Sequence, residues 1–360
     1  MKRTLLAALA VIGSISANAQ IVNATEISVG ADAIISSDMD FLNTASGKLG
    51  NEGTMMLKKN IVNDGTMSPT GRLILNGDAA QRVSGKKTLQ TGTIEFSNAG
   101  TTLNTPVRVN EGAVFNTGIV QADEAFPVIF AENARVTNAS DVSHVDGHVT
   151  IEKAREFTFP IGDGSQLKAF TVDKAENFTA NYKAVSPMYI SKDRSENVEN
   201  MNENEYWVLK SNGRSAATNV SVKNNDGDAT IVSLSKGIWD VADENAVKSS
   251  DKLSSHLPLT STEQLFTIGK GRKNAAGISV YPNPTHGEFA LQFSGIDDSE
   301  NVKVSIALSS GISIMSLEGK AGDLKKTYKM PEDLASQGLI LRMTRTKKNQ
   351  NFVERIVYDK

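Results

Sequence analysis

The sequence contains no cysteine. This absence excludes disulfide bonds, thiolate catalysis, thiolate metal sites and a lipid anchor on an N-terminal cysteine. A protein without disulfides gives up about 2–5 kcal/mol for each bridge that it lacks. We therefore expect the domains of this chain to be stabilised by core burial alone.

Aromatic residues, histidine and an excess of charge are also scarce. Two Trp and six Tyr make no obvious aromatic platform for sugars, and four His leave little for hydrolytic triads. The 38 basic and 41 acidic residues give a formal net charge of −3, which does not support nucleic-acid binding. The sequence also lacks a Gly-x-Ser-x-Gly elbow, a P-loop, a His-Glu-x-x-His pair and a dinucleotide-binding fingerprint. We predict a protein that is not an enzyme, needs no cofactor and has no nucleic-acid partner.

No segment approaches the run of about 18 uninterrupted apolar residues that a membrane-spanning helix needs. The N-terminus instead has the features of a secretory signal peptide. Lys2-Arg3 is followed by the short apolar stretch Leu5–Ile15 and by the small residues Ala17-Asn18-Ala19. We predict a signal peptide over residues 1–19 that is cleaved before Gln20.

Residues 20–140 are built on repetition. Asn51-Glu52-Gly53-Thr54 recurs twelve residues later as Asn63-Asp64-Gly65-Thr66, and Asn98-Ala99-Gly100-Thr101 recurs twelve residues later as Asn110-Glu111-Gly112-Ala113. The Asn-x-Gly sequence favours tight turns, and short apolar segments lie between these turns. Short strands at a constant spacing are typical of a β-solenoid, in which each coil stacks its apolar face on the next. We predict a β-solenoid-like repeat region here, with a β-sandwich as the alternative.

Residues 141–272 lose the repeat. They contain several strand-like runs separated by turn signals, which predict a β-sandwich. Two of these runs, Phe157-Thr158-Phe159-Pro160-Ile161-Gly162-Asp163-Gly164 and Glu205-Tyr206-Trp207, resemble a pattern of Bacteroidetes extracellular proteins. In that pattern, both runs follow a glycine-rich repeat region, and the resemblance carries no catalytic residues to transfer. Trp207 and Trp239 are the right residue type to stack on sugars, but a Trp within an apolar strand is more often a core residue.

The most distinctive stretch of the chain is Val280-Tyr281-Pro282-Asn283-Pro284-Thr285-His286-Gly287. Each Pro fixes its own φ and disfavours helical backbone at the residue before it, so we expect Tyr281 and Asn283 to be extended. Gly287 then allows the chain to turn into the alternating strand Phe289-Ala290-Leu291-Gln292-Phe293. The residue types of this stretch therefore predict a rigid entry into a strand.

The remainder of the C-terminal part also predicts strands. Residues 273–277 contain small and basic residues without apolar periodicity, and we predict that they form a linker. Residues 278–360 are rich in alternating runs and are predicted to form a small C-terminal β-sandwich. Its last two strands, Leu339–Met343 and Phe352–Tyr358, flank a polar stretch as a hairpin should.

The stretch from Val280 to Thr285, with Gly287, resembles the opening of the type A C-terminal sorting domain of the type IX secretion system of Bacteroidetes. Gly338-Leu339-Ile340-Leu341-Arg342 is similar to the family's Gly-x-Tyr strand, with Ile340 in place of the usual aromatic residue. The resemblance covers residues 277–360, less than a quarter of the chain.

The resemblance implies a domain that docks on the type IX translocon after export by the Sec pathway. A surface sortase of that system usually removes the domain and joins the cargo to an anionic lipopolysaccharide. Cleavage would then fall in the linker, near Asn274-Ala275-Ala276-Gly277. Translocon and sortase components are thus the expected partners. The expected location is outside the outer membrane, at the cell surface or in the medium.

Two groups of residues tempt a chemical interpretation. His144, Asp146 and His148 would share one face of a strand, where two imidazoles and a carboxylate suit a metal ion. Polar residues on the solvent-exposed face of a strand would give the same sequence, and we predict no metal site. Asp123-Glu124 is a carboxylate pair of the kind that glycosidases use, but adjacent residues in a strand point to opposite faces.

These features together predict a non-enzymatic, all-β protein of the cell surface or the medium, with an adhesive or structural role. Its further partners would be surface glycans or host and matrix proteins. Two alternatives remain. One is a carbohydrate-active enzyme, a lyase or glycosidase, on the solenoid face. The other is an accessory or signalling component of the secretion system that keeps its sorting domain.

Overall fold

The computed structural model describes residues 19–68, 70–213, 217–242, 247–249, 251–258, 263–272, 276–308, 310–331, 333–346 and 350–360. The predicted signal peptide up to residue 18 lies outside the described residues, as do Asn274 and Ala275 of the predicted processing linker.

The described residues are nearly all β, with 61% in strands, about 2% in helices and about seven turns of a β-solenoid. The predicted all-β class with a solenoid-like repeat region is therefore confirmed. Within the described ranges, no helix has both the length and the apolar character needed to span a bilayer. The described residues divide into two compact units, one within residues 19–193 and 201–269 and the other within residues 194–200 and 270–360. We call them the body and the C-terminal unit.

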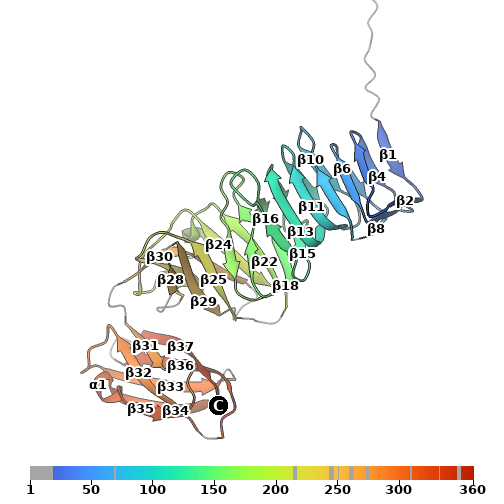
Figure 1. Ribbon diagram of the computed structural model, residues 1–360. Coiled ribbons are helices and arrows are strands. Elements are labelled where there is room, and N and C mark those ends of the chain that lie inside the picture. The colour runs from blue at the N-terminus through green and yellow to red at the C-terminus, as the bar shows by residue number, and fades with distance from the viewer. Residues whose placement is uncertain are drawn as a thin grey trace, which may run out of the picture. The chain divides into compact units, whose positions relative to one another are not determined.

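The body begins as a stack of coils whose strands pair in parallel, as the blue and green part of Figure 1 shows. One sheet takes a strand from each coil: β1 (Gln20–Asn23), β4 (Asp40–Asn43), β7 (Ile61–Asn63), β10 (Gln81–Ser84), β12 (Thr101–Asn104), β14 (Val120–Ala122), β17 (Val145–Gly147) and β20 (Ile161–Gly162). A second, short sheet contains β2 (Glu26–Val29), β5 (Lys48–Asn51) and β8 (Thr66–Met67). The large sheet contains β3 (Ile34–Ser37), β6 (Thr54–Leu57), β9 (Arg72–Leu75), β11 (Leu89–Ser97), β13 (Val107–Thr117), β15 (Val128–Phe130), β16 (Arg135–Thr137) and β18 (Val149–Ala154).

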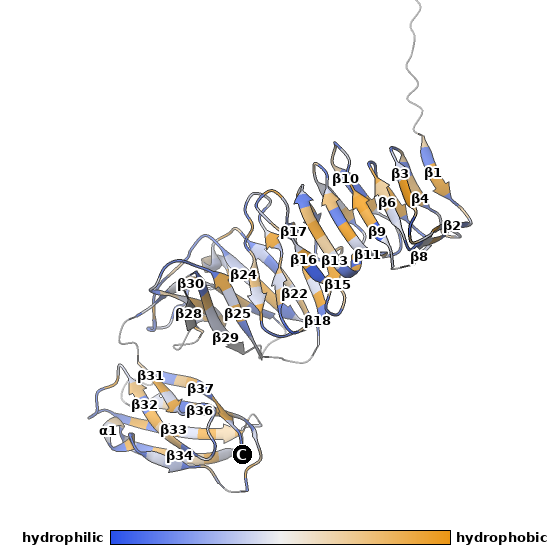
Figure 2. Ribbon diagram, in the orientation of Figure 1, coloured by the Kyte–Doolittle hydropathy of each residue, from blue (hydrophilic) through white to orange (hydrophobic). Residues whose placement is uncertain are grey.

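Alternation along each strand sends every second side chain into the coil interior, where apolar residues are buried. The hydropathy colours of the coil strands in Figure 2 include the orange of these apolar residues. Phe41, Met55 and Leu57 are buried in this way near the start of the stack. Farther along, the rings of Phe96 and Phe115 stack with centroids 5.3 Å apart. Burial of each such side chain contributes about 1.5–3 kcal/mol, which supplies the stability that disulfides do not.

The coils are longer than the twelve-residue spacing of the Asn-x-Gly turns. Gln20 pairs with Asp40, and the side chains of Asn23, Asn43 and Asn63 stack at an interval of 20 residues. The twelve-residue spacing is therefore not the coil length. It marks bends after Asn51, Asn63 and Asn98, but the turn expected at Asn110-Glu111-Gly112 is wrong, because these residues lie within β13 at a register shift against β11. The asparagines form a ladder: Nδ2 of Asn23 donates to Oδ1 of Asn43 at 2.9 Å, and Nδ2 of Asn43 donates to Oδ1 of Asn63 at 2.8 Å. All three residues are buried, so the ladder satisfies amides that would otherwise destabilise the stack.

β11 belongs to the large sheet, and its ladder with β13 is irregular at Gly92. The register of β11 with β13 shifts between Thr91 and Thr93, on either side of this glycine. A Cβ atom at Gly92 would lie 1.9 Å from the carbonyl oxygen of Thr70. This position therefore requires glycine, because the backbone of the preceding coil approaches too closely for any side chain.

Parallel pairing continues to Gly162, so the predicted boundary between residues 140 and 141 falls within the ladder. The large sheet then continues with antiparallel strands: β22 (Ala175–Lys183), β24 (Tyr206–Ser211), β30 (Glu263–Gly271), β26 (Ala229–Ser235) and β27 (Ile238–Val241). The connection between β22 and β24 contains η1 (Pro187–Tyr189) and β23 (Val198–Met201). Buried apolar residues from Val29 to Phe266 form one cluster, so the coils and these strands share a core.

A five-stranded sheet covers the antiparallel part of the large sheet. It consists of β19 (Phe157–Phe159), β21 (Phe170–Val172), β25 (Ala217–Lys223), β29 (Lys252–Pro258) and β28 (Val247–Ser249). Rings from the two sheets meet in a chain of contacts: Phe159 stacks on Phe170 at 4.9 Å, Phe170 meets Phe266 edge-on at 5.2 Å, and Phe266 stacks on Trp207 at 5.5 Å. Trp207 and Trp239 are both buried, which places them in the core as expected.

The C-terminal unit has a core of its own, between two antiparallel sheets. The smaller sheet contains β31 (Gly277–Tyr281), β32 (Glu288–Ser294) and β35 (Thr327–Lys329). The larger contains β34 (Ser313–Lys320), β33 (Asn301–Leu308), β36 (Gln337–Arg345) and β37 (Gln350–Tyr358), and the single α-helix of the described chain is α1 (Ala321–Leu324). β36 and β37 pair as the predicted terminal hairpin.

Candidate functional site

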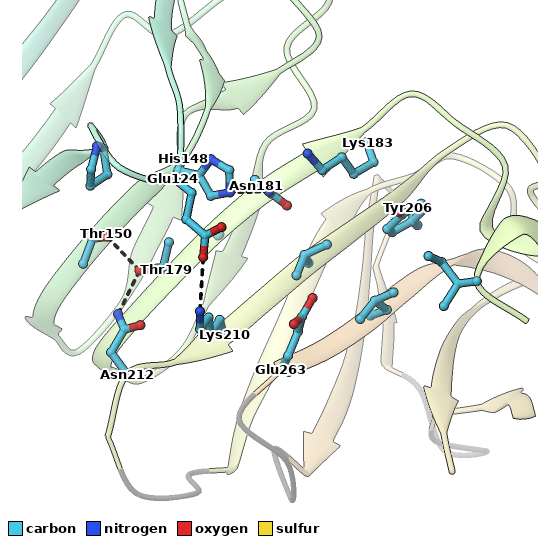
Figure 3. Close-up of a pocket in the computed structure, with 15 residues that line it drawn as sticks. Glu124, His148, Thr150, Thr179, Asn181, Lys183, Tyr206, Lys210, Asn212 and Glu263 are labelled. Carbon is cyan, nitrogen blue, oxygen red and sulfur yellow. Dashed lines mark hydrogen bonds and ion pairs between the residues drawn. The ribbon is translucent and has the colours of Figure 1, made fainter. Parts of the chain in front are cut away.

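A groove of about 410 Å³ crosses the outer face of the large sheet in the body. Its floor consists of side chains from β18, β22, β24 and β30, as Figure 3 shows. Glu124 and Pro127 line it from the connection between β14 and β15, and Ile190 lines it from the residue after η1. The volume lies within the range of about 300–1,000 Å³ that is typical of small-ligand sites.

The strand register explains why these side chains meet. Cross-strand neighbours form three rows on the groove face: Thr150, Thr179, Lys210 and Glu263; Asn181, Val208 and Leu265; Lys183 and Tyr206. The residues between them in sequence alternate to the other face, where Phe178, Trp207 and Phe266 join the core. The same alternation therefore places one set of side chains in the groove and the other set in the core beneath it.

Asn181 and His148 form a polar pair at the groove. Nδ2 of Asn181 lies 2.6 Å from Nε2 of His148 and donates to it. Burial lowers the pKa of His148 from 6.5, with a further contribution from Lys183 and a smaller opposing one from Glu124. The neutral imidazole that accepts at Nε2 carries its proton on Nδ1. A hydrogen bond between the His148 ring and the backbone of Ala122 opposes this lowering of the pKa. Among the described residues, Oδ1 of Asn181 has no hydrogen-bond partner.

The charged side chains of the groove balance. Nζ of Lys210 lies 3.3 Å from Oε1 of Glu124, in a solvent-accessible ion pair that contributes about 0–1 kcal/mol. Lys183 and Glu263 supply one further charge of each sign. Burial, and then Glu263, raise the pKa of Tyr206, so its phenol remains a neutral hydrogen-bond donor. With His148 neutral, the lining carries no net charge.

Glu205 lies next to Tyr206 and fixes the start of β24. Its Oε2 pairs with Nζ of Lys168 at 2.7 Å and accepts from the hydroxyl of Tyr182. Burial and this hydrogen bond raise the pKa of Tyr182 far above its usual value. Nε1 of Trp207 donates to the carbonyl oxygen of Lys168 at 2.7 Å, so the Glu-Tyr-Trp strand is tied to the segment that follows the Phe-Pro-Ile-Gly-Asp-Gly run.

The structure gives His144, Asp146 and His148 separate environments. His144 is fully buried; its Nδ1 donates to the carbonyl oxygen of Ser140 at 2.9 Å, and its Nε2 accepts from the backbone N–H of Gly164 at 3.2 Å. Asp146 accepts from the side chain of Gln121, whereas His148 contacts Asn181. The described part of the chain contains no group of three or more His, Cys, Asp or Glu side chains that could hold a metal ion.

Asp123 and Glu124 also have separate partners. Oδ1 of Asp123 accepts from the backbone N–H groups of Ala125 and Phe126, both at 2.9 Å, and so shapes the turn. Glu124 instead lines the groove and pairs with Lys210. The two carboxylates therefore do not face each other across a common substrate position.

In the C-terminal unit, the proline-containing stretch lies beside the last strand. Tyr281 ends β31, as expected from the proline that follows it, and the peptide bonds before Pro282 and Pro284 are both cis. Nδ2 of Asn283 donates to the carbonyl oxygen of Arg355 at 2.8 Å. Its Oδ1 accepts from the backbone N–H of Val357 at the same distance, so the side chain pairs with β37 as a backbone amide would.

Thr285 continues this pairing. Its backbone N–H donates to the carbonyl oxygen of Val357 at 2.9 Å, and its own carbonyl oxygen accepts from Asp359 at 3.0 Å. The side chain is fully buried and donates to the carbonyl oxygen of Glu288 at 2.8 Å. Gly287 has a φ of 117°, which supports its predicted role in the turn into β32. We call residues 283–285 with their bonds to β37 the clasp.

The described half of the predicted processing linker belongs to the folded unit. Ala276 packs against the core of the C-terminal unit, and Gly277 is the buried first residue of β31. A protease would therefore reach the peptide bonds at Ala276 and Gly277 only after β31 opened locally.

Sequence comparison adds no assignment, since the chain matches no known family and no curated protein. Sequence reasoning also missed Asn181, Lys183 and Lys210. These are single polar residues in alternating strands, separated from His148 and Glu124 by whole strands. Only the register of the antiparallel sheet brings them together, and no local motif signals it.

Proposed function

We propose that this protein is exported to the cell surface or the medium, with the C-terminal unit as its sorting signal and the body as its passenger. The supporting observation is the clasp: the residues that carry the resemblance to type A sorting domains are those that close this unit on its own last strand. The unit also has a separate core, as a transferable signal requires. Its partners are then the type IX translocon and sortase.

For the body we propose a non-enzymatic, adhesive or structural role. The coils and the antiparallel strands share one core and present a continuous sheet face, which suits repeated weak contacts with an extended partner. The separate orientation of Asp123 and Glu124 favours this role over acid–base hydrolysis.

The experiment is localisation of the full chain in a Bacteroidetes strain with an intact type IX translocon and in a matched strain that lacks it. We expect surface or extracellular protein in the first strain and periplasmic retention in the second. An equal extracellular fraction in both strains would reject the sorting role. Mass spectrometry of the surface form then locates its C-terminus, and an intact end at Lys360 argues against removal of the unit.

A further inference from the structure

We infer that the groove on the large sheet binds an uncharged oligosaccharide. This inference deepens the adhesive role proposed for the body and rests on it, but it is independent of the export route. It depends on three properties of the groove: its position on the sheet, its charge balance and the polar groups at Asn181.

The position of the groove excludes recognition by backbone pairing. It lies on the face of strands β18, β22, β24 and β30, whose backbone groups already pair with one another. A peptide that adds a strand needs an open sheet edge. A ligand here therefore contacts side chains alone.

The balance of charged side chains in the groove disfavours a charged ligand. The two ammonium groups, Lys183 and Lys210, are matched by Glu124 and Glu263. No arginine lines the groove, although arginine is the usual partner for phosphate or carboxylate groups. A neutral ligand whose groups both donate and accept hydrogen bonds fits this lining, because carboxylates only accept and ammonium groups only donate.

Asn181 supplies the specific feature. It is 6% exposed, and its Oδ1 has no partner within the described part of the chain. Buried amides are normally satisfied, and this oxygen has less than 1 Å² of accessible surface, so it accepts from a ligand hydroxyl group only when the side chains over it move. Ile190 is 50% exposed and adds apolar surface beside these polar groups, against which the C–H face of a sugar ring packs.

The test is isothermal titration calorimetry of the full exported chain, from residue 20 to residue 360. The probes are cellohexaose, maltohexaose, xylohexaose and mannohexaose, with hexagalacturonic acid as the charged comparison. We expect a Kd between about 10 μM and 1 mM for at least one neutral probe, and weaker binding of the charged one. Heat with none of the neutral probes, or a preference for the charged probe, would overturn the inference.

Three variants locate the binding. Asn181→Ala and Lys183→Ala should each weaken binding of the neutral probe, the first by about tenfold or more. Lys183 is exposed, so its substitution does not threaten folding. Asn116→Ala, on the outer face of β13 and outside the groove, is the matched control and should leave the Kd unchanged. Equal affinity in all three variants would place binding elsewhere and reject the groove.

These outcomes are separable from those of the export experiment. Binding by purified protein does not require a translocon, so normal export without binding rejects only the oligosaccharide site. Binding without translocon-dependent export rejects only the sorting role.

Discussion

The side-chain oxygen of Asn283 accepts a hydrogen bond from the backbone N–H of Val357 at 2.8 Å, across almost the whole sequence of the C-terminal unit. β37 lies at the edge of its sheet, where unpaired backbone groups invite further strand pairing. The clasp satisfies several of those groups. A sequence that reads as an export signal therefore also has a structural role within its own domain.

We predict that Asn283→Ala destabilises the C-terminal unit by about 1–2 kcal/mol, because two backbone groups of β37 lose their partner. Hydrogen–deuterium exchange of residues 350–360 measures the effect, and exchange should accelerate. Asn351→Ala is the control, since Asn351 is exposed and its side chain only accepts from the hydroxyl of Thr344. If both variants exchange alike, the clasp does not stabilise the edge.

The asparagine ladder gives a second prediction. Asn43→Ala removes one of the two acceptors of Asn23 Nδ2 and the donor to Asn63 Oδ1 inside the coil stack. We expect the free energy of unfolding of the body to fall by about 2–4 kcal/mol, measured by denaturant titration. The exposed Asn116→Ala should change it by less than about 0.5 kcal/mol. Similar losses in the two variants would show that the ladder adds nothing.

Close backbone approach at Gly92 gives a third prediction. A Cβ atom there would lie 1.9 Å from the carbonyl oxygen of Thr70, so Gly92→Ala must displace backbone. We expect a destabilisation of about 2 kcal/mol or more. Gly30→Ala is the control, because a Cβ there meets no atom within 4 Å, and it should be neutral within about 1 kcal/mol. The measurement is the melting temperature of each variant, compared with that of the unsubstituted protein.

His148 gives a pH dependence. Burial lowers its pKa from 6.5, so the unfolded chain binds a proton more readily than the folded one below that pH. Stability from this group is therefore complete above about pH 6.5 and is lost as the pH falls from that value through the lower pKa of the folded state. The NMR titration of the His148 ring should have its midpoint below 6.5. His148→Gln should reduce the fall in melting temperature between about pH 7 and pH 5, and a midpoint at or above 6.5 would contradict the prediction.

The all-β class and the coils follow from the sequence because they depend on local signals. Short apolar runs such as Leu73–Leu75 lie between turn residues, and alternation along each strand defines an inner face. The coil length was harder to predict from the sequence. The Asn-x-Gly sequences repeat at twelve residues, whereas the coil length of 20 is marked by Asn23, Asn43 and Asn63. Each of these ends a run of two apolar residues and asparagine, Ile-Val-Asn in the first and third and Phe-Leu-Asn in the second, so the signal is present in the sequence but is weaker than the Asn-x-Gly repeat.

The groove could not be predicted from the sequence, for a different reason. Glu124, His148, Asn181 and Lys210 come from separate strands and a loop, and no two of them lie within one motif. Their meeting depends on the register between β18, β22 and β24, which is determined by which residues face the shared core. The clasp illustrates an intermediate case. Its residues were evident from the sequence, but their partner strand was not.

Because the coils are stacked one after another, their order determines how the body responds to a pulling force. Among the described strands, β1 has its only ladder with β4, and each later coil is bonded to the neighbour on either side. A load applied at Gln20 therefore acts on one short ladder at a time. Such an arrangement peels coil by coil under tension and dissipates work in small steps, so a force–extension trace should show a series of low, regularly spaced peaks.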